Sequence, residues 1–387
     1  MNITGIITEY NIFHNGHKYQ IDEIKKHSDA VIAVMSGSFV QRGDVAITDK
    51  WSRAKTALLG GVDLVIELPV CYVLNAAPNF ATGGINILNA LGVVNNICFG
   101  SESGSIDELM SAAELLENEN SEISEKIKKY VMGGMSYPNA LTKAYSALIP
   151  SDILSEPNNI LATEYIRALI RSDSKIKPMT VKRHKAGYHD RNLYQNIASA
   201  TKLREMKRNN ENINDFIPYK LEDINCDIPY DISNLDSAII SKLRLMTAEE
   251  LQNISEVTEG IENRILSSAN MSYSFETLVE NVKNKRYTTS KIRRMIISAL
   301  IGFTKDIYSP MPQYIRILGM NKVGMTILKQ AKGICKVPII TKTADFKEQS
   351  PQFNLDVRAT NIAMLCNPIP THRIGNADLK KSPIIMK

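Results

Sequence analysis

The stretch that decides the fold begins with Ile3-Thr4-Gly5-Ile6-Ile7-Thr8 and continues, after a short connection, with His14-Asn15-Gly16-His17 and Lys18–His27. The first run is typical of a buried β-strand, and the last has the pattern of a helix. Two histidines between a strand and a helix can converge with the helix N-terminus on the phosphates of a nucleotide. Gly16 would let the backbone approach those phosphates closely. The stretch therefore predicts nucleotidyl transfer on an α/β fold.

A second candidate phosphate-binding element lies far along the chain, at Ile197-Ala198-Ser199-Ala200-Thr201-Lys202-Leu203-Arg204. Either Ser199 or Thr201 can cap the helix that follows, which leaves N–H groups and a hydroxyl for a phosphate. Lys202 and Arg204 supply positive charge. Alone, the segment is better explained as an ordinary capped surface helix; together with the histidine motif, it favours a phosphate site.

The first hundred residues alternate between strand and helix patterns. Expected strands are 3–8, 30–36, 62–68 and 95–99, and expected helices are 18–27, 50–59 and 80–91. Apolar strands separated by helices predict an α/β fold with a doubly wound parallel sheet. Ligands bind at the carboxyl ends of such strands, where His14, Ser36-Gly37-Ser38 and Gly100-Ser101-Glu102 all fall.

Later segments suggest further regions. Residues 106–149 read as a helical insertion, a helix follows Pro157, and 176–181 resumes a strand. We expect a catalytic domain with this insertion over residues 1–222 and a linker at 223–230. A helical, basic region follows over 223–310, and a small mixed α/β C-terminal region over 311–387.

Composition excludes several classes of protein. The chain has 387 residues, of which 44% are hydrophobic and 22% charged, as in an ordinary globular protein. No apolar run approaches the roughly 20 residues of a membrane span and no cleavable leader is evident, so we expect a cytoplasmic protein. The five cysteines are odd in number, far apart and without a C-x-x-C pair, so they suggest neither a disulfide framework nor a zinc site.

The net charge of +5 is mild, but the basic residues are clustered. The segment 283–294 holds six cations and no acid, and Tyr287 among them could stack on a base. The cations are Lys283, Lys285, Arg286, Lys291, Arg293 and Arg294. Further clusters lie at 182–185 and 202–208. A solvated helix face would explain one such run, but three together favour a polyanionic partner.

The motifs read in series resemble the bacterial tRNA(Met) cytidine acetate ligase family. The resemblance is carried by 5–17, 34–43, 50–55, 61–69, 99–102, 158–161, 183–190 and 197–204, and more loosely by 285–288 and 314–319. It covers nearly the whole chain. Ile12 departs from the family's N-P-F-H-N-G-H, where proline would fix φ; its loss would loosen the loop without removing a catalytic group.

The resemblance implies a HIGH-like Rossmann nucleotidyltransferase domain that activates acetate with ATP. The acetyl group would pass from acetyl-adenylate to N4 of the wobble cytidine of elongator tRNA(Met), giving N4-acetylcytidine. Carried over residue by residue, the catalytic set is His14, His17, Thr201, Lys202 and Arg204. The ATP contacts would be Ile7, Thr8, Glu9, Tyr10, Asn11, Phe13, His14, Asn15, Gly16, His17, Gly100, Asn159, Arg183, Ser199 and Thr201. Magnesium would accompany ATP without a dedicated protein metal site, because carboxylates do not cluster in the sequence.

The wobble cytidine lies in a single-stranded loop, so its Watson–Crick edge can be read without opening a duplex. The basic segment would follow phosphates of the anticodon arm.

Several residues keep more than one interpretation. Asn159 could instead cap a helix, and Trp51 is better explained by core packing than by base stacking. The loop 41–43 could touch substrate. His189 and Asp190 could form an acid/base pair or a loop hydrogen bond.

Two other functions stay open at this point. The first is a small-molecule adenylyl- or cytidylyltransferase of the same fold. The basic helical region in the C-terminal half argues against it, because a small substrate needs no such surface. A non-catalytic RNA-binding protein would not need intact His14, His17, Thr201 and Arg204.

Overall fold

A computed structural model describes residues 1–183, 197–224, 229–258 and 260–387. Its main sheet has the strand order β10-β8-β5-β2-β1-β6-β7, with β9 paired to β8, and a separate hairpin pairs β3 with β4. The strands are β1 Ile3–Thr8, β2 Ala30–Ser36, β3 Phe39–Val40, β4 Asp44–Val45, β5 Leu64–Leu68, β6 Asn96–Ser101, β7 Lys177–Lys182, β8 Ile315–Met320, β9 Ile339–Ile340 and β10 Ile384–Ile385.

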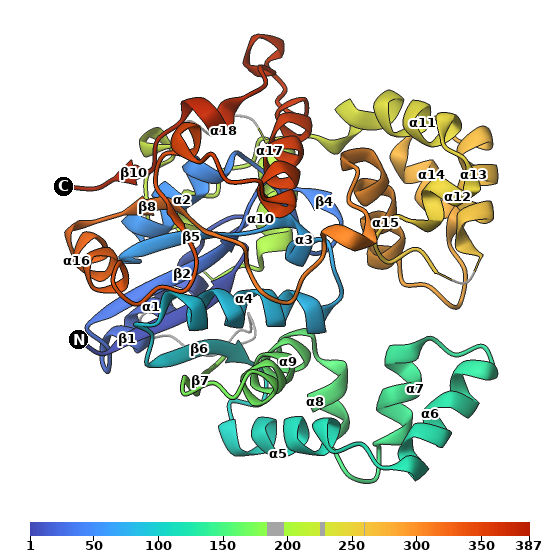
Figure 1. Cartoon of the computed structure of the whole chain (residues 1–387), viewed down its shortest axis with the longest axis horizontal. Helices are drawn as coiled ribbons and strands as arrows, with labels where there is room; N and C mark the ends of the chain where they lie inside the picture. Colours follow the sequence, from blue (N-terminus) through green and yellow to red (C-terminus); the bar gives the residue numbers. More distant parts are fainter. Residues whose placement is uncertain (184–196, 225–228, 259) are drawn as a thin grey trace.

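The described helices cover both faces of this sheet and build two lobes beside it (Figure 1). They are α1 Asn15–Lys25, α2 Lys50–Leu59, α3 Val70–Val73, α4 Ala77–Leu91, α5 Ile106–Glu117, α6 Ser121–Met132, α7 Tyr137–Ala144, α8 Ser151–Ser155, α9 Pro157–Arg171, α10 Ala200–Arg208, α11 Asp236–Leu245, α12 Ala248–Gln252, α13 Ile261–Met271, α14 Phe275–Val282, α15 Thr289–Ile301, α16 Lys322–Ala331, α17 Pro351–Met364 and α18 Ala377–Lys380.

The order of the strands fixes where a ligand can bind. β1 pairs in parallel with β2 on one side and with β6 on the other, and β5 and β7 extend the sheet outward in parallel. The chain thus winds in one direction from β1 to β5 and then returns to the other side of β1 for β6. The gap between the carboxyl ends of β1 and β6 is the topological switch point, where open α/β sheets bind ligands.

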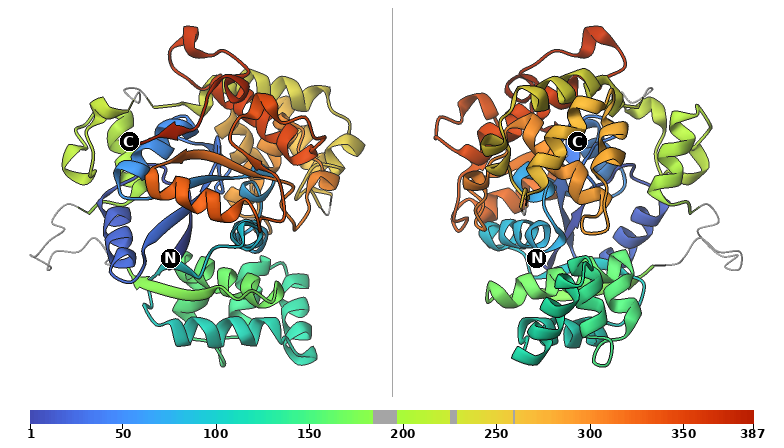
Figure 2. Two further views of the ribbon diagram at one scale, coloured as in Figure 1. Left: turned by 60° about the vertical axis from the view of Figure 1, so that its left-hand side comes forward. Right: turned by 90° about the vertical axis from the view of Figure 1, so that its right-hand side faces the viewer.

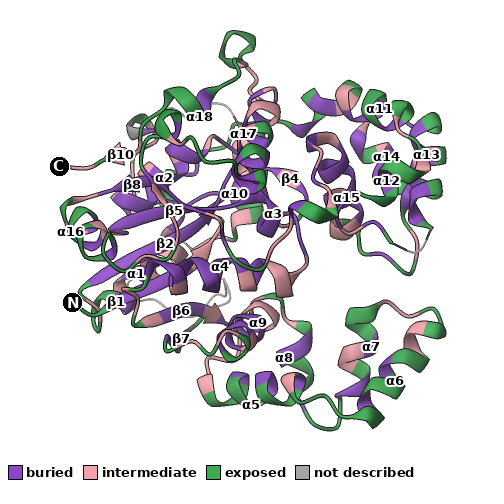
Figure 3. Cartoon of the chain, viewed as in Figure 1, coloured by how far each residue is buried: buried purple, intermediate pink, exposed green. Residues whose placement is uncertain are grey.

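Alternate residues of the central strands enter two separate cores, as a sheet covered on both faces requires. Val31, Ala33 and Met35 of β2 pack with apolar residues of α1 and α2. Their neighbours Ala30, Ile32 and Val34 pack on the other face with α4. The central strands are therefore buried on both sides (Figure 3). This confirms the doubly wound α/β fold.

The strands expected in the first hundred residues pair in parallel as predicted, and the complete sheet is mixed because strands of the C-terminal region join it. β8 runs antiparallel to β5, and β9 and β10 both pair with β8. The mixed α/β region expected over 311–387 therefore adds its strands to the first sheet. The direction of β8 depends on which end of the sheet the chain reaches after the helical region, and no local pattern in β8 encodes that.

Two helical lobes lie at the side of the sheet opposite the N-terminus (Figure 1). One is built from α5–α8 and the other from α11–α15, and both views in Figure 2 keep them apart. The first lobe is the helical insertion expected from the sequence, and the second falls within the predicted helical region. Of the expected linker at 223–230, residues 225–228 lie outside the described residues. The exact domain borders therefore stay predictions.

Local boundaries differ from expectation mainly at α1 and at α4, which begins at Ala77 rather than Phe80. Helix α1 begins at Asn15 rather than Lys18, because the side chain of His14 caps it. The strands expected at 30–36 and the helix expected at 50–59 are found at those residues. No described helix is long and apolar enough to cross a membrane.

Candidate active site

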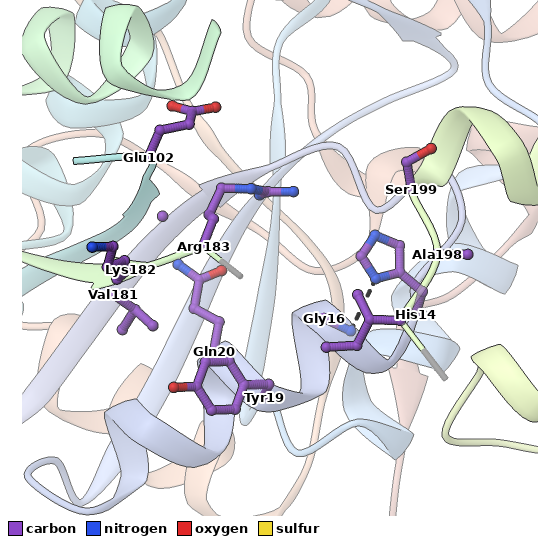
Figure 4. A pocket seen from close by; sticks show the side chains of 12 residues that line it. His14, Gly16, Tyr19, Gln20, Glu102, Val181, Lys182, Arg183, Ala198 and Ser199 are labelled. Atoms are coloured by element: carbon purple, nitrogen blue, oxygen red, sulfur yellow. Dashed lines mark hydrogen bonds between the residues drawn. The ribbon is translucent and has the colours of Figure 1, made fainter. Parts of the chain in front are cut away.

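A cavity of about 260 Å³ opens at the switch point between β1 and β6 (Figure 4). It takes residues from four parts of the chain: α1, the end of β6, the end of β7 and the segment before α10. The lining residues are His14, Gly16, Tyr19, Gln20, Gly100, Glu102, Val181, Lys182, Arg183, Ile197, Ala198 and Ser199. The two phosphate-binding elements predicted from distant parts of the sequence therefore meet at one cavity.

His14 and His17 hold each other in place at the start of α1. The Gly16 N–H donates to His14 Nδ1 (3.0 Å), and the His14 N–H donates to His17 Nδ1 (3.3 Å). The two rings stack with centroids 3.8 Å apart. Since each Nδ1 accepts a hydrogen bond, the network assigns the proton of each neutral imidazole to Nε2. His14 lines the cavity and keeps this N–H donor for a ligand, whereas His17 stacks on it and is not among the lining residues.

Burial keeps both imidazoles uncharged. His14 is 4% exposed, and its burial, with Arg183 and Arg204 nearby, lowers its pKa to about 4. Burial also lowers the pKa of His17 well below its ordinary value, helped by His14 and Arg183. Neutral donors can stabilise negative charge that develops on a phosphate without a prior proton transfer.

Gly16 is required by the close packing of this capped turn. A Cβ atom at Gly16 would lie 2.9 Å from His14 Cε1 and 3.0 Å from His14 Nδ1. Any side chain there would push the imidazole out of its position. The requirement is steric and comes from His14, in addition to the approach of phosphates that the sequence suggested.

The loop between β1 and α1 is fixed from two sides although it lacks proline. Asn11 Oδ1 accepts from the Ile47 N–H (2.7 Å), and the Asn11 carbonyl accepts from Arg204 Nη1 (2.6 Å). Beneath the loop, the Tyr10 and Phe13 rings contact His17 at centroid distances of 4.9 and 5.6 Å. The predicted residues Tyr10, Asn11 and Phe13 therefore support the histidines and do not line the cavity.

α10 presents its N-terminus to the cavity through Ser199. The Ser199 hydroxyl accepts from the Lys202 N–H (3.2 Å), so Ser199 is the cap and Thr201 is not. Thr201 and Lys202 are exposed in the first turn, and Thr201 Oγ1 accepts from Arg204 Nη2 (3.0 Å). Arg204 reaches inward to Asn11, which links α10 to the histidine loop.

On the opposite wall, Gly100 and Arg183 line the cavity as predicted. A Cβ atom at Gly100 would lie 3.1 Å from Arg183 Cγ, so glycine leaves room for the arginine. Glu102, whose carboxylate accepts from the Asn159 N–H (2.8 Å), was expected at the ligand-binding edge of the sheet but was not among the predicted ATP contacts. Asn159 Oδ1 in turn accepts from the N–H groups of Glu102 and Ser103.

Asn159 differs from its expected role. It is fully buried, does not line the cavity, and its side-chain amide also donates to the Asp152 carbonyl (3.1 Å). The side chain therefore holds the loop after β6 and does not cap its own helix. Tyr19 and Gln20 line the cavity but were missed, although they follow Gly16 at helical spacing.

The basic segment 283–294 does not form one surface, and this corrects the prediction for two of its arginines. Arg294 is 7% exposed and forms an ion pair with Glu256 (2.6 Å). Arg293 pairs with Glu276 (2.7 Å) and stacks on Phe275. Both arginines are held within the protein and are not offered to a polyanion.

The rest of the segment is more accessible. Lys283, Lys285 and Arg286 are exposed, and Lys291 is half-buried beside the Tyr287 ring (5.0 Å). Tyr287 itself is buried, and its hydroxyl donates to the Thr258 carbonyl (3.1 Å), so it is not a free stacking surface.

Trp51 is 4% exposed, which agrees with core packing. His189 and Asp190 lie outside the described residues, as do His184 and Lys185 of the second basic cluster. No group of three or more potential metal ligands occurs among the residues that the structure describes.

Comparisons with known proteins give a consistent result. The model of the HIGH Nucleotidyl Transferase family matches residues 1–378. The chain is 40% identical to a tRNA(Met) cytidine acetate ligase of Clostridium novyi and 38% identical to one of Acetivibrio thermocellus, in both cases over the full length of both chains. The crystal structure of Thermotoga maritima TmcAL bound with alpha-thio ATP is similar with a TM-score of 0.90 and 32% identity, again covering both chains completely.

Proposed function

The chain belongs to the HIGH nucleotidyl transferase family and, within it, to the tRNA(Met) cytidine acetate ligases, and from this premise we propose how its residues activate acetate and modify tRNA. The observation that carries the proposal is the cavity at the switch point. His14, Arg183 and Ser199 at the N-terminus of α10 meet there, far apart in the sequence but around one space, and the neutral His17 stacks on His14. This arrangement suits the triphosphate of ATP.

In the first step, an acetate oxygen attacks the α-phosphate of ATP, and pyrophosphate leaves. The carboxylate is its own nucleophile, so the protein has to align the reactants and stabilise developing charge. His14 and His17 would donate their Nε2–H groups to the phosphate oxygens. Thr201, Lys202 and Arg204 would act on the leaving phosphates from the first turn of α10, and Gly100 and Arg183 would adjoin the nucleoside.

Magnesium would arrive with ATP and neutralise phosphate charge. The described residues hold no cluster of ligands for it, so the phosphates and water would supply most of its coordination. Asn159, placed behind the cavity, would position the Glu102 loop rather than contact the adenosine.

In the second step, the exocyclic amine of the wobble cytidine attacks the acetyl carbon of acetyl-adenylate. Elongator tRNA(Met) is the proposed acceptor, which would place the reaction in the cytoplasm. The exposed Lys283, Lys285 and Arg286, with Lys291 beside them, are the proposed phosphate contacts.

The test is acetate-dependent exchange of labelled pyrophosphate into ATP by the pure full-length protein. Elongator tRNA(Met) transcript is then added, and its anticodon nucleosides are analysed by mass. Exchange together with N4-acetylcytidine supports the proposal. Exchange with another acid but not acetate would reject acetate, transfer to a small molecule would indicate a small-molecule nucleotidyltransferase, and tRNA binding without any exchange would indicate a non-catalytic RNA-binding protein.

A further inference from the structure

Two exposed arginines take no part in the reaction as proposed above. Arg42 is the middle residue of the tip 41–43, which joins β3 to β4, and Arg208 is the last residue of α10. Both side chains are exposed, and within the described part of the chain neither has a hydrogen bond or an ion pair with another residue. Single exposed arginines are ordinary on a protein surface, so the surroundings of these two decide whether they can bind a partner.

The hairpin tip holds the backbone of Arg42 in a fixed place. The Gln41 carbonyl accepts from Arg294 Nη1 (3.3 Å), and the Gly43 carbonyl accepts from Arg293 Nε (3.2 Å). Gly43 has φ +72°, and a Cβ atom there would lie 2.6 Å from the main-chain nitrogen of Arg294. The residues on both sides of Arg42 are thus held directly against α15, while its own side chain extends into solvent.

α10 leads from the cavity to the second arginine. Ser199 lines the cavity and caps this helix (Figure 4). Thr201, Arg204 and Arg208 follow at spacings of three and four residues, so they share one face of the helix. Arg204 donates to the Asn11 carbonyl (2.6 Å), which fixes this face against the loop of the motif histidines. Arg208 therefore lies about 13 Å from Ser199 along the helix axis.

The hairpin and α10 bring the two arginines to one place. Leu203 of α10 and Ile47, just after β4, pack in the same apolar cluster. Burial lowers the pKa of Arg204, and the like charges of Arg42 and Arg208 lower it further, although nearby carboxylates oppose the shift. The three side chains therefore form a guanidinium cluster, made of Arg42, Arg204 and Arg208.

Acids beside the guanidinium cluster have other partners. Glu205 pairs with Lys202 (3.2 Å), and Asp44 lies beside Arg293 (3.5 Å). Glu9 accepts from a main-chain N–H of the hairpin tip (2.6 Å). Among the described residues, the two exposed arginines are left without a paired carboxylate. Neighbouring guanidiniums in this state suit a phosphate, which can accept two parallel N–H bonds from each and relieve their mutual repulsion.

We propose that Arg42 and Arg208 bind phosphates of the acceptor RNA beside the nucleotide that reacts. The inference rests on the proposed function and deepens it. A nucleotide in a single-stranded loop can turn its base into a pocket while its phosphates stay at the protein surface. The guanidinium cluster is separated from the cavity by one short helix, so the phosphates that it meets belong to nucleotides near the reacting one. α15, which follows the exposed cations 283–286, holds the tip that carries Arg42.

The first test uses the full-length Arg42→Gln and Arg208→Gln variants. Each should bind elongator tRNA(Met) about 3–10-fold more weakly, and the slope of log affinity against log salt should fall by about 0.7 per arginine. Pyrophosphate exchange with acetate should stay within about twofold of wild type, because neither arginine lines the cavity. Arg358→Gln, which removes the same charge from an exposed position of α17, is the matched control.

Unchanged affinity and slope in both variants would overturn the proposal, as would an equal loss in the control or a loss of exchange. An effect in one variant alone would remove the other arginine from the site. Absence of exchange, or of tRNA binding, in the wild-type protein would instead reject the proposed function.

The second test locates the contact on the RNA. Elongator tRNA(Met) is assembled with one uncharged methylphosphonate at each phosphate of the anticodon loop in turn. At one or both phosphates that flank the wobble cytidine, this change should weaken binding to the wild-type protein by about 3–10-fold. It should have no further effect on the Arg42→Gln/Arg208→Gln double variant, because the contact is already lost. Equal losses in the two proteins at every position would overturn the proposal.

Discussion

At the scale of single residues, the most consequential feature is that the two motif histidines are neutral. Their Nδ1 atoms serve the backbone of α1, and burial keeps the rings uncharged. The same contacts that begin the helix therefore also select the tautomer of both rings, including that of His14, which lines the cavity. One pair of side chains would thus perform both the helix capping and the proposed recognition of phosphate.

Replacing His14 by asparagine separates these two roles. Asparagine is a good helix cap, so α1 should stay folded while the Nε2–H donor is lost. Loss of one donor to developing charge typically costs about 10²–10³-fold in rate, and we expect that loss in pyrophosphate exchange. His27→Asn, at an exposed position just after the same helix, is the control. Exchange that survives His14→Asn would show that this imidazole is not a donor to the phosphates.

The lowered pKa of His14 also predicts a pH dependence of stability. Its folded value of about 4 lies below the ordinary 6.5, so between these values the unfolded chain binds more protons. The free energy of unfolding should therefore fall as the pH drops through this window, by about 2 kcal/mol at about pH 5 from His14 alone. Urea unfolding of wild type and His14→Asn, compared near neutral pH and near pH 5, measures this contribution. Parallel curves for the two proteins would contradict it.

The sequence predicted which types of residue form the site better than it predicted where each of these residues lies. His14, Gly16, Gly100, Arg183 and Ser199 line the cavity as expected. Asn159 could not be placed correctly, because its role depends on meeting a loop that is 56 or more residues away along the chain. Burial of that kind is a tertiary property, and a motif records only which residue type is present.

At the scale of elements, the cations of the basic segment 283–294 differ in exposure according to whether they precede α15 or lie within it. Arg293 and Arg294 lie in the second turn of α15 and point into the protein, whereas Lys283, Lys285 and Arg286 precede the helix and stay exposed. Placing the start of the helix after Thr288 would have separated the two groups, but charge clustering alone could not.

The exposed group yields a prediction about tRNA binding. Lys283→Gln, Lys285→Gln and Arg286→Gln together should weaken binding of elongator tRNA(Met) and reduce the dependence of log affinity on log salt by about 1–3. The matched control replaces Lys322, Lys329 and Lys332 by glutamine, three exposed lysines in and just after α16, on the other side of the molecule (Figure 1). Equal losses in the two triple variants would show that only net charge matters.

At the scale of the whole molecule, a buried group of four charges joins the C-terminal segment to the first half of the sheet. Lys50 contacts Glu67 (2.6 Å) and Asp378 (2.8 Å), and Arg316 contacts the same two carboxylates (3.1 and 2.6 Å). All four side chains are at most 3% exposed. The charges balance, so removal of any one leaves an uncompensated charge in the core.

Arg316→Met should therefore destabilise the fold by about 3–5 kcal/mol, the usual cost of breaking a buried ion pair from one side. Arg358→Met, at an exposed arginine of α17, should change stability by no more than about 0.5 kcal/mol. Chemical unfolding of the three proteins provides the comparison. A small effect at Arg316 would mean that water or rearrangement compensates the remaining carboxylates.

The overall architecture was predictable where structure is local. The alternation of strands and helices over the first hundred residues is enough to indicate β1, β2, β5 and β6 with their crossovers. The place of β8 was not, because it pairs with β5 across a separation of about 250 residues and in the opposite direction. The residues of a strand do not by themselves determine which strand it pairs with or in which direction it runs.

The late position of β8 bears on how the protein is made. Until residues beyond Met320 leave the ribosome, β5 is an open edge with unpaired N–H and C=O groups. During the same interval Lys50 and Glu67 lack their ion-pair partners Asp378 and Arg316. An open apolar edge invites pairing with other chains. The nascent nucleotide domain would thus be aggregation-prone throughout the synthesis of the helical region, and shielding by chaperones would matter most during that interval.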